Sequence, residues 1–257
     1  MDFPARIKQQ TCSDCLSGQE LGFAIKMAFQ PIIDWQQQSI FAYEALVRGP
    51  EGQGAAWVFA QVNKDNRYYF DQACRVKAIE TAARLGCSSY LSINFMPNAV
   101  YNPETCIQAT LEASELYGFC KEKIIFEVIE TEEIPDKGHL TRIFQSYARH
   151  GFLTAIDDYG AGFANLEWLQ VLKPNILKLD MALIRDIEQS PAKQAIVRST
   201  IAQCELQGTT VLAEGIETAA ELNWLVAAGV RYLQGYYFAR PALESLTPWS
   251  DIDTLQQ

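Results

Sequence analysis

Charged and amide side chains stand directly after most of the short apolar runs in this chain, where a buried strand would end. They are Glu44 after SIFAY, Asn94 after YLSI, Glu127 after KIIF, Asp157 and Asp158 after LTAI, Lys178 after NIL, Glu214 after VLA and Gln234 after RYL. If these runs are parallel strands of a barrel, their carboxyl ends meet on one face, where such barrels carry their chemistry. We therefore expect these side chains to form one site.

The acidic members of this set would repel one another. For a single acidic residue after a strand, capping of the following helix is an equally good interpretation. That interpretation does not extend to five carboxylates in one place, because they need cations among them to be buried together. The pattern therefore predicts a metal site.

The ligand types indicate the metal. Carboxylates and the amide oxygen of Asn94 are hard oxygen donors, which suit Mg²⁺ or Mn²⁺. The two histidines, His139 and His150, lie in a predicted helix, which argues against a histidine-based zinc centre. Five carboxylates exceed the needs of one octahedral ion. Two ions bridged by one aspartate fit better and would suit in-line hydrolysis of a phosphodiester.

Short apolar segments alternate with segments of helical periodicity. The predicted strands are 27–33, 39–43, 89–93, 123–126, 152–156, 175–179, 209–213 and 230–233, and the predicted helices include 70–85, 192–207 and 218–228, the last with Thr218 as N-cap. This alternation predicts a parallel α/β sheet, and seven or eight strands favour a closed (β/α)8 TIM-like barrel. A doubly wound open sheet is the alternative, but no G-x-G-x-x-G follows the first strand.

The composition limits the partners and the compartment. The 257 residues carry a formal net charge of −10 without a dense Lys/Arg cluster, so we expect no DNA or RNA polymer as partner. Seven cysteines without disulfide-framework spacing indicate a reducing, cytosolic compartment. No apolar run approaches the roughly 20 residues that span a membrane, and the N-terminus lacks a signal-peptide pattern. We therefore expect a soluble, intracellular protein.

A series of motifs occurs in the order found in a known family. They are FQP at 29–31, YEALVRG at 43–49, INF at 93–95, FEVIETE at 126–132, IDDYGAG at 156–162, KLD at 178–180, AEGIET at 213–218 and QGYYFARP at 234–241. With these motifs the chain resembles the EAL-domain cyclic di-GMP phosphodiesterases, and in particular the EAL domains of light-sensing BLUF–EAL proteins. The resemblance divides the chain into an N-terminal segment (1–26), a barrel (27–241) and a C-terminal tail (242–257).

The resemblance implies a barrel with one antiparallel strand that hydrolyses cyclic di-GMP to linear pGpG with two Mg²⁺ or Mn²⁺ ions. By motif position, the first ion's ligands match Glu44, Asn94, Glu127 and Asp157, and the second ion's match Asp157, Asp158 and Glu214. The resemblance further implies a homodimer, a sensor or signalling protein as partner, and a bacterial cytoplasmic location.

The remaining motif residues resemble catalytic and substrate-binding groups. Lys178 resembles the residue that positions the attacking water, Glu214 a group that assists its deprotonation, and Gln234 a hydrogen-bonding group beside it. The other matches are Arg48 for a substrate phosphate, Gln30, Arg240 and Pro241 for the nucleotide cleft, and Glu130 for anchoring the loop after Asp158.

The loop after the paired aspartates departs from the commonest family form, since DDYGAGFANL replaces DDFGTGYSSL. Ala161 removes a hydroxyl group from this loop, and we favour a variant with normal turnover over one with altered regulation. The rivals to an active enzyme are a receptor that binds cyclic di-GMP without cleaving it and a protein-interaction module. Cys12 and Cys15 have the spacing of a zinc or redox site, but no second pair completes one.

Overall fold

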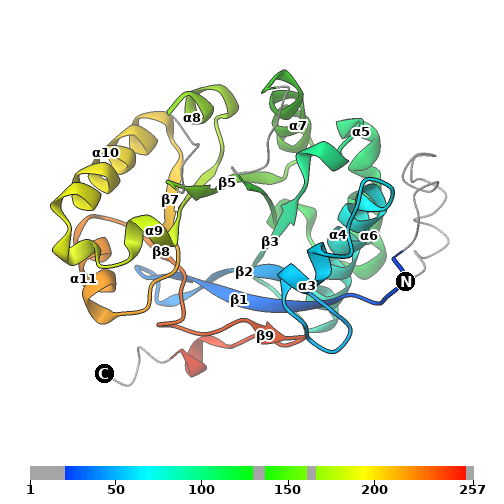
Figure 1. Ribbon diagram of the computed structural model, residues 1–257, viewed down its shortest axis with the longest axis horizontal. Helices are drawn as coiled ribbons and strands as arrows, with labels where there is room; N and C mark the ends of the chain where they lie inside the picture. The colour runs from blue at the N-terminus through cyan, green and yellow to red at the C-terminus, as the bar shows by residue number, and fades with distance from the viewer. Residues whose placement is uncertain (1–20, 130–136, 161–165, 253–257) are drawn as a thin grey trace.

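The computed structural model describes residues 21–129, 137–160 and 166–252. Within these ranges nine strands are surrounded by helices (Figure 1). The strands are β1 (Lys26–Asp34), β2 (Ser39–Arg48), β3 (Tyr90–Phe95), β4 (Ile124–Ile129), β5 (Leu153–Tyr159), β6 (Ile176–Leu179), β7 (Thr210–Ala213), β8 (Tyr232–Leu233) and β9 (Ala242–Leu243). The α-helices are α3 (Ala55–Phe59), α4 (Arg67–Arg84), α5 (Pro103–Cys106), α6 (Gln108–Tyr117), α7 (Lys137–Arg149), α8 (Leu166–Leu172), α9 (Met181–Ile184), α10 (Pro191–Gln207) and α11 (Ala219–Ala227).

Strands β1 to β8 close into a barrel. Each strand from β2 to β8 is parallel to the next, and β1 closes the ring by pairing antiparallel with both β2 and β8. This arrangement confirms the predicted TIM-like barrel with one antiparallel strand, and all eight predicted strands are present. The additional strand β9 comes from the predicted C-terminal tail and pairs with Ala28 and Phe29 of β1.

An apolar layer fills the barrel. It consists of buried residues from six different strands, Ile32, Ala42, Ile125, Ala155, Ile176 and Leu212, which pack together as a cluster of their own. Only the inside of a closed barrel brings alternate residues of so many strands together. We call this layer the floor of the barrel, because it fills the interior below the carboxyl ends of the strands.

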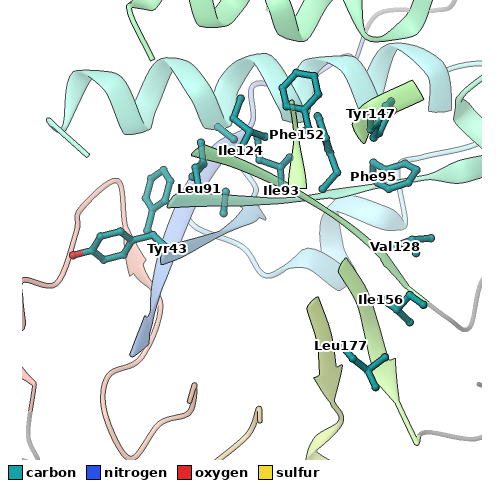
Figure 2. Packing of buried hydrophobic residues seen from close by; sticks show 14 of the residues in the cluster. Tyr43, Leu91, Ile93, Phe95, Ile124, Val128, Tyr147, Phe152, Ile156 and Leu177 are labelled. Atoms are coloured by element: carbon teal, nitrogen blue, oxygen red, sulfur yellow. The ribbon is translucent and has the colours of Figure 1, made fainter. Parts of the chain in front are cut away.

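A larger apolar layer lies between the barrel and its helices. Figure 2 shows Leu91, Ile93 and Phe95 of β3 in this layer, together with Tyr147 of α7 and Phe152. The rings of Phe95 and Tyr147 lie 5.4 Å apart. Because successive strand residues point to opposite faces, the residues between these three on β3, Ser92 and Asn94, face the barrel interior.

The buried side chain of Arg75 links helix α4 to this outer layer. Arg75 is fully buried, forms an ion pair with Asp71 at 2.7 Å and donates a hydrogen bond to the Tyr147 hydroxyl at 2.8 Å. Its guanidinium group also lies 5.0 Å from the centre of the Phe126 ring, within cation–π range. These contacts stabilise the buried charge of Arg75. The helical pattern in the sequence of α4 had not indicated that this arginine lies in the core.

The three helices predicted at 70–85, 192–207 and 218–228 are present as α4, α10 and α11, although α4 begins earlier than predicted, at Arg67. Thr218 caps α11 with a capping box, in which its side chain accepts from the Glu221 amide and Glu221 accepts from the Thr218 amide. Helix α10 begins with Ser190 as N-cap and Pro191 at its first position, and Gly208 ends it in the left-handed conformation. None of the helices in the described ranges is long and apolar enough to cross a lipid bilayer.

Candidate functional site: an acidic cluster at the carboxyl ends of the strands

The polar residues predicted from the sequence form the next layer above the apolar floor of the barrel. Glu44, Glu127, Asp157, Lys178 and Glu214 lie two positions beyond Ala42, Ile125, Ala155, Ile176 and Leu212, respectively. Because side chains alternate along a strand, all five enter the barrel on the same face as the floor, one level nearer the carboxyl ends. The structure therefore brings together residues as far apart in the sequence as Glu44 and Glu214.

The ammonium group of Lys178 lies among four of these carboxylates. Its Nζ atom is 2.5 Å from Glu214, 2.8 Å from Glu127, 3.1 Å from Asp157 and 3.8 Å from Glu44, measured to the nearest carboxylate oxygen. The lysine side chain is 1% exposed. One ammonium group cannot balance four carboxylates, so further cations would stabilise the cluster.

Burial and crowding shift the pKa values of these groups. Burial raises the pKa of Glu127 to about 8; the charge of Lys178 lowers it, while Glu44 and Asp157 raise it. Burial also raises the pKa of Glu214 well above its usual value, and Asp157 adds to the effect. For Lys178, burial lowers the pKa, but the surrounding carboxylates more than offset this and raise the pKa well above the usual range. The lysine is therefore charged.

Asp158 has an unusual backbone conformation near the end of β5, where the pairing with β6 is irregular. Its φ of +58° lies in the left-handed region, which residues with a Cβ adopt rarely and mostly at functional sites. The carboxylate of Asp157 accepts a hydrogen bond of 2.9 Å from the Asp158 amide and so supports this turn. Burial, with the nearby Asp157 charge, raises the pKa of Asp158 to about 6.

The carboxylates fall into two groups that fit a pair of cations. Oxygens of Glu44, Glu127 and Asp157 lie within 4.8 Å of one another, and so do oxygens of Asp157, Asp158 and Glu214. Asp157 belongs to both groups. The buried amide oxygen of Asn94 has no hydrogen-bond partner, while its nitrogen donates to Glu44 at 3.0 Å. Buried oxygens normally have a hydrogen-bond partner, and a hard divalent cation bound by Asn94 and the carboxylates would take that place.

Gln234 connects the acidic cluster to the antiparallel strand. Its amide nitrogen donates to Glu44 at 2.7 Å and to the Gln30 side chain at 3.3 Å. Gln30 in turn donates to the Ala239 carbonyl at 3.2 Å. These bonds fix the orientation of both amides and tie β1 and the segment after β8 to the site.

Two cavities open beside the cluster. One, of about 260 Å³, is lined mainly by apolar side chains between the barrel and helices α3 and α4, and it reaches Glu44, Asn94 and Asp157. The other, of about 210 Å³, includes Gln30, Glu44, Glu214, Gln234 and the half-exposed Tyr236. Glu44 and Leu46 line both. The acidic cluster therefore lies where two pockets meet.

Some of the predicted substrate-binding residues lie at the edge of this arrangement. Arg48 ends β2, and its guanidinium group donates to the Val47 carbonyl at 2.8 Å, so it does not line either cavity. Arg240 lies 4.2 Å from the ring centre of Tyr236, which lines the second cavity. Pro241 directly precedes β9 and lines neither cavity. Glu130, like Ala161 and the pair Cys12 and Cys15, lies outside the described residues.

Two residues of the site had not been predicted from the sequence. Ser92 is fully buried and donates a short hydrogen bond to the Glu127 carboxylate. Its position two residues before Asn94 on the same strand was the available signal, because both must face the barrel interior. Glu217 lines the second cavity, and nothing in the chain pattern distinguishes it from an ordinary helix-capping glutamate.

Together, the fold and the site define a class of protein: a closed mixed barrel with an acidic, metal-type site at the carboxyl ends of its parallel strands. The chain belongs to the EAL domain family, whose family model matches residues 19–241. This match confirms the family resemblance found in the motifs.

Relatives and solved structures agree with this assignment. The blue light- and temperature-regulated antirepressor BluF of Escherichia coli is 30% identical over 220 residues, which are 85% of this chain and 55% of BluF. The chain thus spans about half the length of BluF. Other matched relatives, from E. coli and Shewanella oneidensis, are named cyclic di-GMP phosphodiesterases.

Two solved structures are similar along most of the chain. A standalone EAL protein from Vibrio cholerae, in its cyclic di-GMP-bound form, is 50% identical with a TM-score of 0.86, over 89% of this chain and 97% of that one. Klebsiella pneumoniae BlrP1, in a complex with manganese and cyclic di-GMP, is 34% identical with a TM-score of 0.82, over 88% of this chain and 58% of that one.

Proposed function

We propose that this protein is a phosphodiesterase that hydrolyses cyclic di-GMP to linear pGpG with two divalent ions, Mg²⁺ or Mn²⁺. The observation that carries the proposal is the division of the buried carboxylates into two groups that share Asp157. A pair of cations bridged by one aspartate is an arrangement suited to in-line displacement at a phosphodiester. The hard oxygen donors favour Mg²⁺ or Mn²⁺ over softer metals.

The proposed ligands divide in the same way. Glu44, Asn94, Glu127 and Asp157 would hold one ion, and Asp157, Asp158 and Glu214 would hold the other. When bound, the ions would neutralise charge on the scissile phosphate and lower the pKa of a water molecule for attack.

The remaining side chains would position the reactants. Lys178 would hold the attacking water in line, and Glu214 would accept its proton, since both groups meet at 2.5 Å. Gln234, held by its bonds to Glu44 and Gln30, would donate a hydrogen bond beside them. The short contact holds both side chains in place, and fixed positions of the groups that orient and deprotonate the water favour efficient reaction.

The two cavities support a ligand with a central phosphate and a base on either side. They meet at Glu44, so such a ligand would place its scissile phosphate at the acidic cluster. Gln30, which lines the second cavity, and Arg240, which contacts Tyr236 of that cavity, would bind the ligand there, together with Pro241, the residue after Arg240. Arg48 would pair with a phosphate after its guanidinium group leaves the Val47 carbonyl.

Product analysis tests the proposal. The protein is incubated with cyclic di-GMP and Mg²⁺ or Mn²⁺, and the nucleotides are separated by chromatography. We expect pGpG that disappears with a chelator and in Glu44→Ala. Glu51→Ala, which changes an exposed glutamate in the loop after β2, serves as the matched control and should leave product formation unchanged.

The same experiment separates the rival functions. Cyclic di-GMP that is bound but stays intact with either metal would make the protein a receptor. If no cyclic di-GMP binds, a role in protein–protein interaction is left, as the name antirepressor suggests for BluF. The homodimer, the sensor or signalling partner, the cytoplasmic location and the anchoring role of Glu130 stay predictions.

A further inference from the structure

The one-turn helix α9 lies between the end of β5, which carries Asp157 and Asp158, and the loop after β7, which carries Glu214. It begins directly after Asp180, whose carboxylate caps it by accepting from the Ala182 amide at 2.8 Å. On one side, the Asp180 amide donates to the carbonyl of Tyr159, the last residue of β5, at 3.1 Å. On the other side, the Glu214 amide donates to the Leu179 carbonyl at 3.1 Å.

Two glycines bring these loops into close contact with α9. Gly160 (φ +105°) lies against Leu183, and Gly215 (φ +66°) lies against Met181. A Cβ atom at either glycine would overlap the neighbouring side chain. Both positions also have a positive φ, where an L-residue is strained. Helix α9 therefore packs closely against Gly160, which directly follows β5, and against Gly215, which directly follows Glu214.

Arg185, the residue after α9, holds the second of these loops. Its guanidinium group lies 2.8 Å from the Glu217 carboxylate and donates to the Glu221 carboxylate at 3.3 Å. It also donates to the carbonyl of Gly215 at 3.4 Å. Gly215 directly follows Glu214, so this contact acts on the backbone of a proposed metal ligand.

Glu221 joins the loop after Glu214 to the segment after α9. Its side chain is 1% exposed, and its carboxylate accepts hydrogen bonds from the amides of Glu217 at 2.8 Å, Thr218 at 3.0 Å and Asp186 at 3.1 Å. Asp186 belongs to the segment after α9, whereas Glu217 and Thr218 belong to the loop after Glu214. One buried carboxylate thus joins the two segments, and Arg185 balances its charge.

We propose that Arg185 is a positioning residue for Glu214: by fixing the Gly215–Thr218 backbone, it holds the Glu214 carboxylate where it can share a divalent ion with Asp157 and Asp158. The inference rests on the proposed two-metal function and adds a residue that touches neither the ions nor the substrate. An arginine is required because its planar fork reaches two carboxylates and a carbonyl at once, which a lysine cannot do.

Manganese binding tests the inference directly. Mn²⁺ is titrated into the metal-free protein and into Arg185→Met and Arg185→Lys, and bound ions are counted by electron paramagnetic resonance, which also detects spin coupling between two neighbouring Mn²⁺ ions. Thermal unfolding of the metal-free proteins is measured in parallel. Arg198→Met is the matched control, since the Arg198 guanidinium group on α10 stacks on the ring of Trp224 on α11, 5.0 Å from its centre.

For Arg185→Met we expect the concentration of Mn²⁺ that half-fills the second site to rise by about 10- to 100-fold, as is typical when a group that orients a metal ligand is removed. The first site keeps its affinity, and the spin-coupled signal is lost at Mn²⁺ concentrations that saturate the wild type. Arg185→Lys should recover part of the affinity, because it keeps one charge beside Glu217. Arg198→Met should match the wild type.

Three other results would overturn the inference. Arg185→Met with wild-type affinity at both sites shows that the loop needs no such support. Equal weakening of both sites together with a lower unfolding temperature shows a general structural role. If the wild type itself binds fewer than two ions, the proposed two-metal function fails, and the inference with it, which distinguishes this outcome from the first two.

Discussion

Lys178 donates a hydrogen bond of 2.8 Å to Glu127, and the two side chains are 1% and 2% exposed, respectively. The pair joins β4 and β6, which flank β5 with its Asp157. A buried ion pair is a weak source of stability, since desolvation offsets most of the attraction, but removal of one partner leaves an uncompensated charge. The main effect of Lys178 is therefore to balance the negative charge of the carboxylates around it.

Replacing Lys178 by methionine should affect stability and activity in different ways. Without added metal, we expect Lys178→Met to lower the free energy of unfolding by about 3–5 kcal/mol, because the surrounding carboxylates lose their buried cation. Added Mn²⁺ should raise its unfolding temperature more than that of the wild type, since bound ions take over the charge balance. Pre-steady-state product formation with saturating metal should fall by about 10²-fold or more, as expected when a group that positions a reactant is lost.

The matched control for this variant is Lys77→Met, which removes a partly exposed lysine paired with Glu80 at 3.0 Å on the surface of α4. Its stability should change by no more than about 0.5 kcal/mol, with no dependence on metal. An equal gain from Mn²⁺ in Lys178→Met and in the wild type would contradict the assigned role of Lys178 in the charge balance.

Ser92 should matter because it orients Glu127. Its hydroxyl is fully buried inside the barrel and donates to the Glu127 carboxylate. We expect Ser92→Ala to raise the Mn²⁺ concentration needed for half-maximal product formation by about 10-fold or more. Ser89→Ala is the control, since Ser89 donates only to the Ile40 carbonyl near the other end of the strand. Similar metal requirements in both variants would speak against the orienting role.

The ion pair between Asp34 and Arg231 closes the barrel where β1 meets β8. Arg231 donates through two nitrogens to the two oxygens of Asp34, at 2.9 and 2.5 Å. Burial raises the pKa of Asp34, but the Arg231 contacts and the Gln37 amide more than offset this, so that the pKa lies below its usual value. Since Arg231 is 37% exposed, we expect Asp34→Asn to cost only about 1–2 kcal/mol at pH 7.

The sign of the pH dependence follows from the lowered pKa. The folded protein binds a proton at Asp34 less readily than the unfolded chain, whose pKa is about 3.9, so the contribution of Asp34 is present above that pH and lost as the pH falls through the folded value. In urea unfolding, the difference between wild type and Asp34→Asn should be constant from pH 7 to about 5 and shrink below about 4. A difference that grows toward acid pH would refute this assignment. Glu80→Gln, at the partly exposed pair with Lys77 on α4, should change stability by no more than about 0.5 kcal/mol.

The barrel and the acidic cluster were predictable because both follow from local patterns. The strands read as apolar runs, and five residues of the cluster stand two positions beyond a floor residue of the same strand, as Glu127 does beyond Ile125. A period of two fixes which side chains share a face, and parallel strands bring their ends together. The sequence therefore identified the members of the cluster before their distances were known.

The contacts that depend on the path of the chain in space were not predictable in this way. Arg185 and Glu221 are 36 residues apart and meet only because two loops of the barrel are neighbours. Arg75 stands in a helix with an ordinary polar pattern, yet it is fully buried between aromatic rings. Likewise, the ninth strand forms because β1 offers a free edge to residues 242–243, which have no strand-like period of their own.

Gly235 lies where the loop after Glu214 and the segment after Gln234 approach each other closely. A Cβ atom on Gly235 would overlap the backbone of Ile216, two residues beyond Glu214. The Ile216 amide donates to the Gln234 carbonyl at 3.2 Å, and the Tyr237 amide donates to the Ile216 carbonyl at 3.0 Å. Gly235→Ala must therefore push apart the loops that carry Glu214 and Gln234, and we expect a loss of about 1–3 kcal/mol in stability together with reduced product formation.

Gly54→Ala separates this overlap from the general effect of a glycine substitution. Gly54 has a φ of −64°, which any L-residue adopts, and nothing lies within 4 Å of the position of its Cβ atom. This variant should change the free energy of unfolding by no more than about 0.5 kcal/mol and leave product formation unchanged. Urea unfolding and product analysis of both variants check the prediction. If Gly235→Ala proved as stable and active as Gly54→Ala, the two loops would have room to move apart, and their close approach would not be what sets the geometry of Glu214 and Gln234.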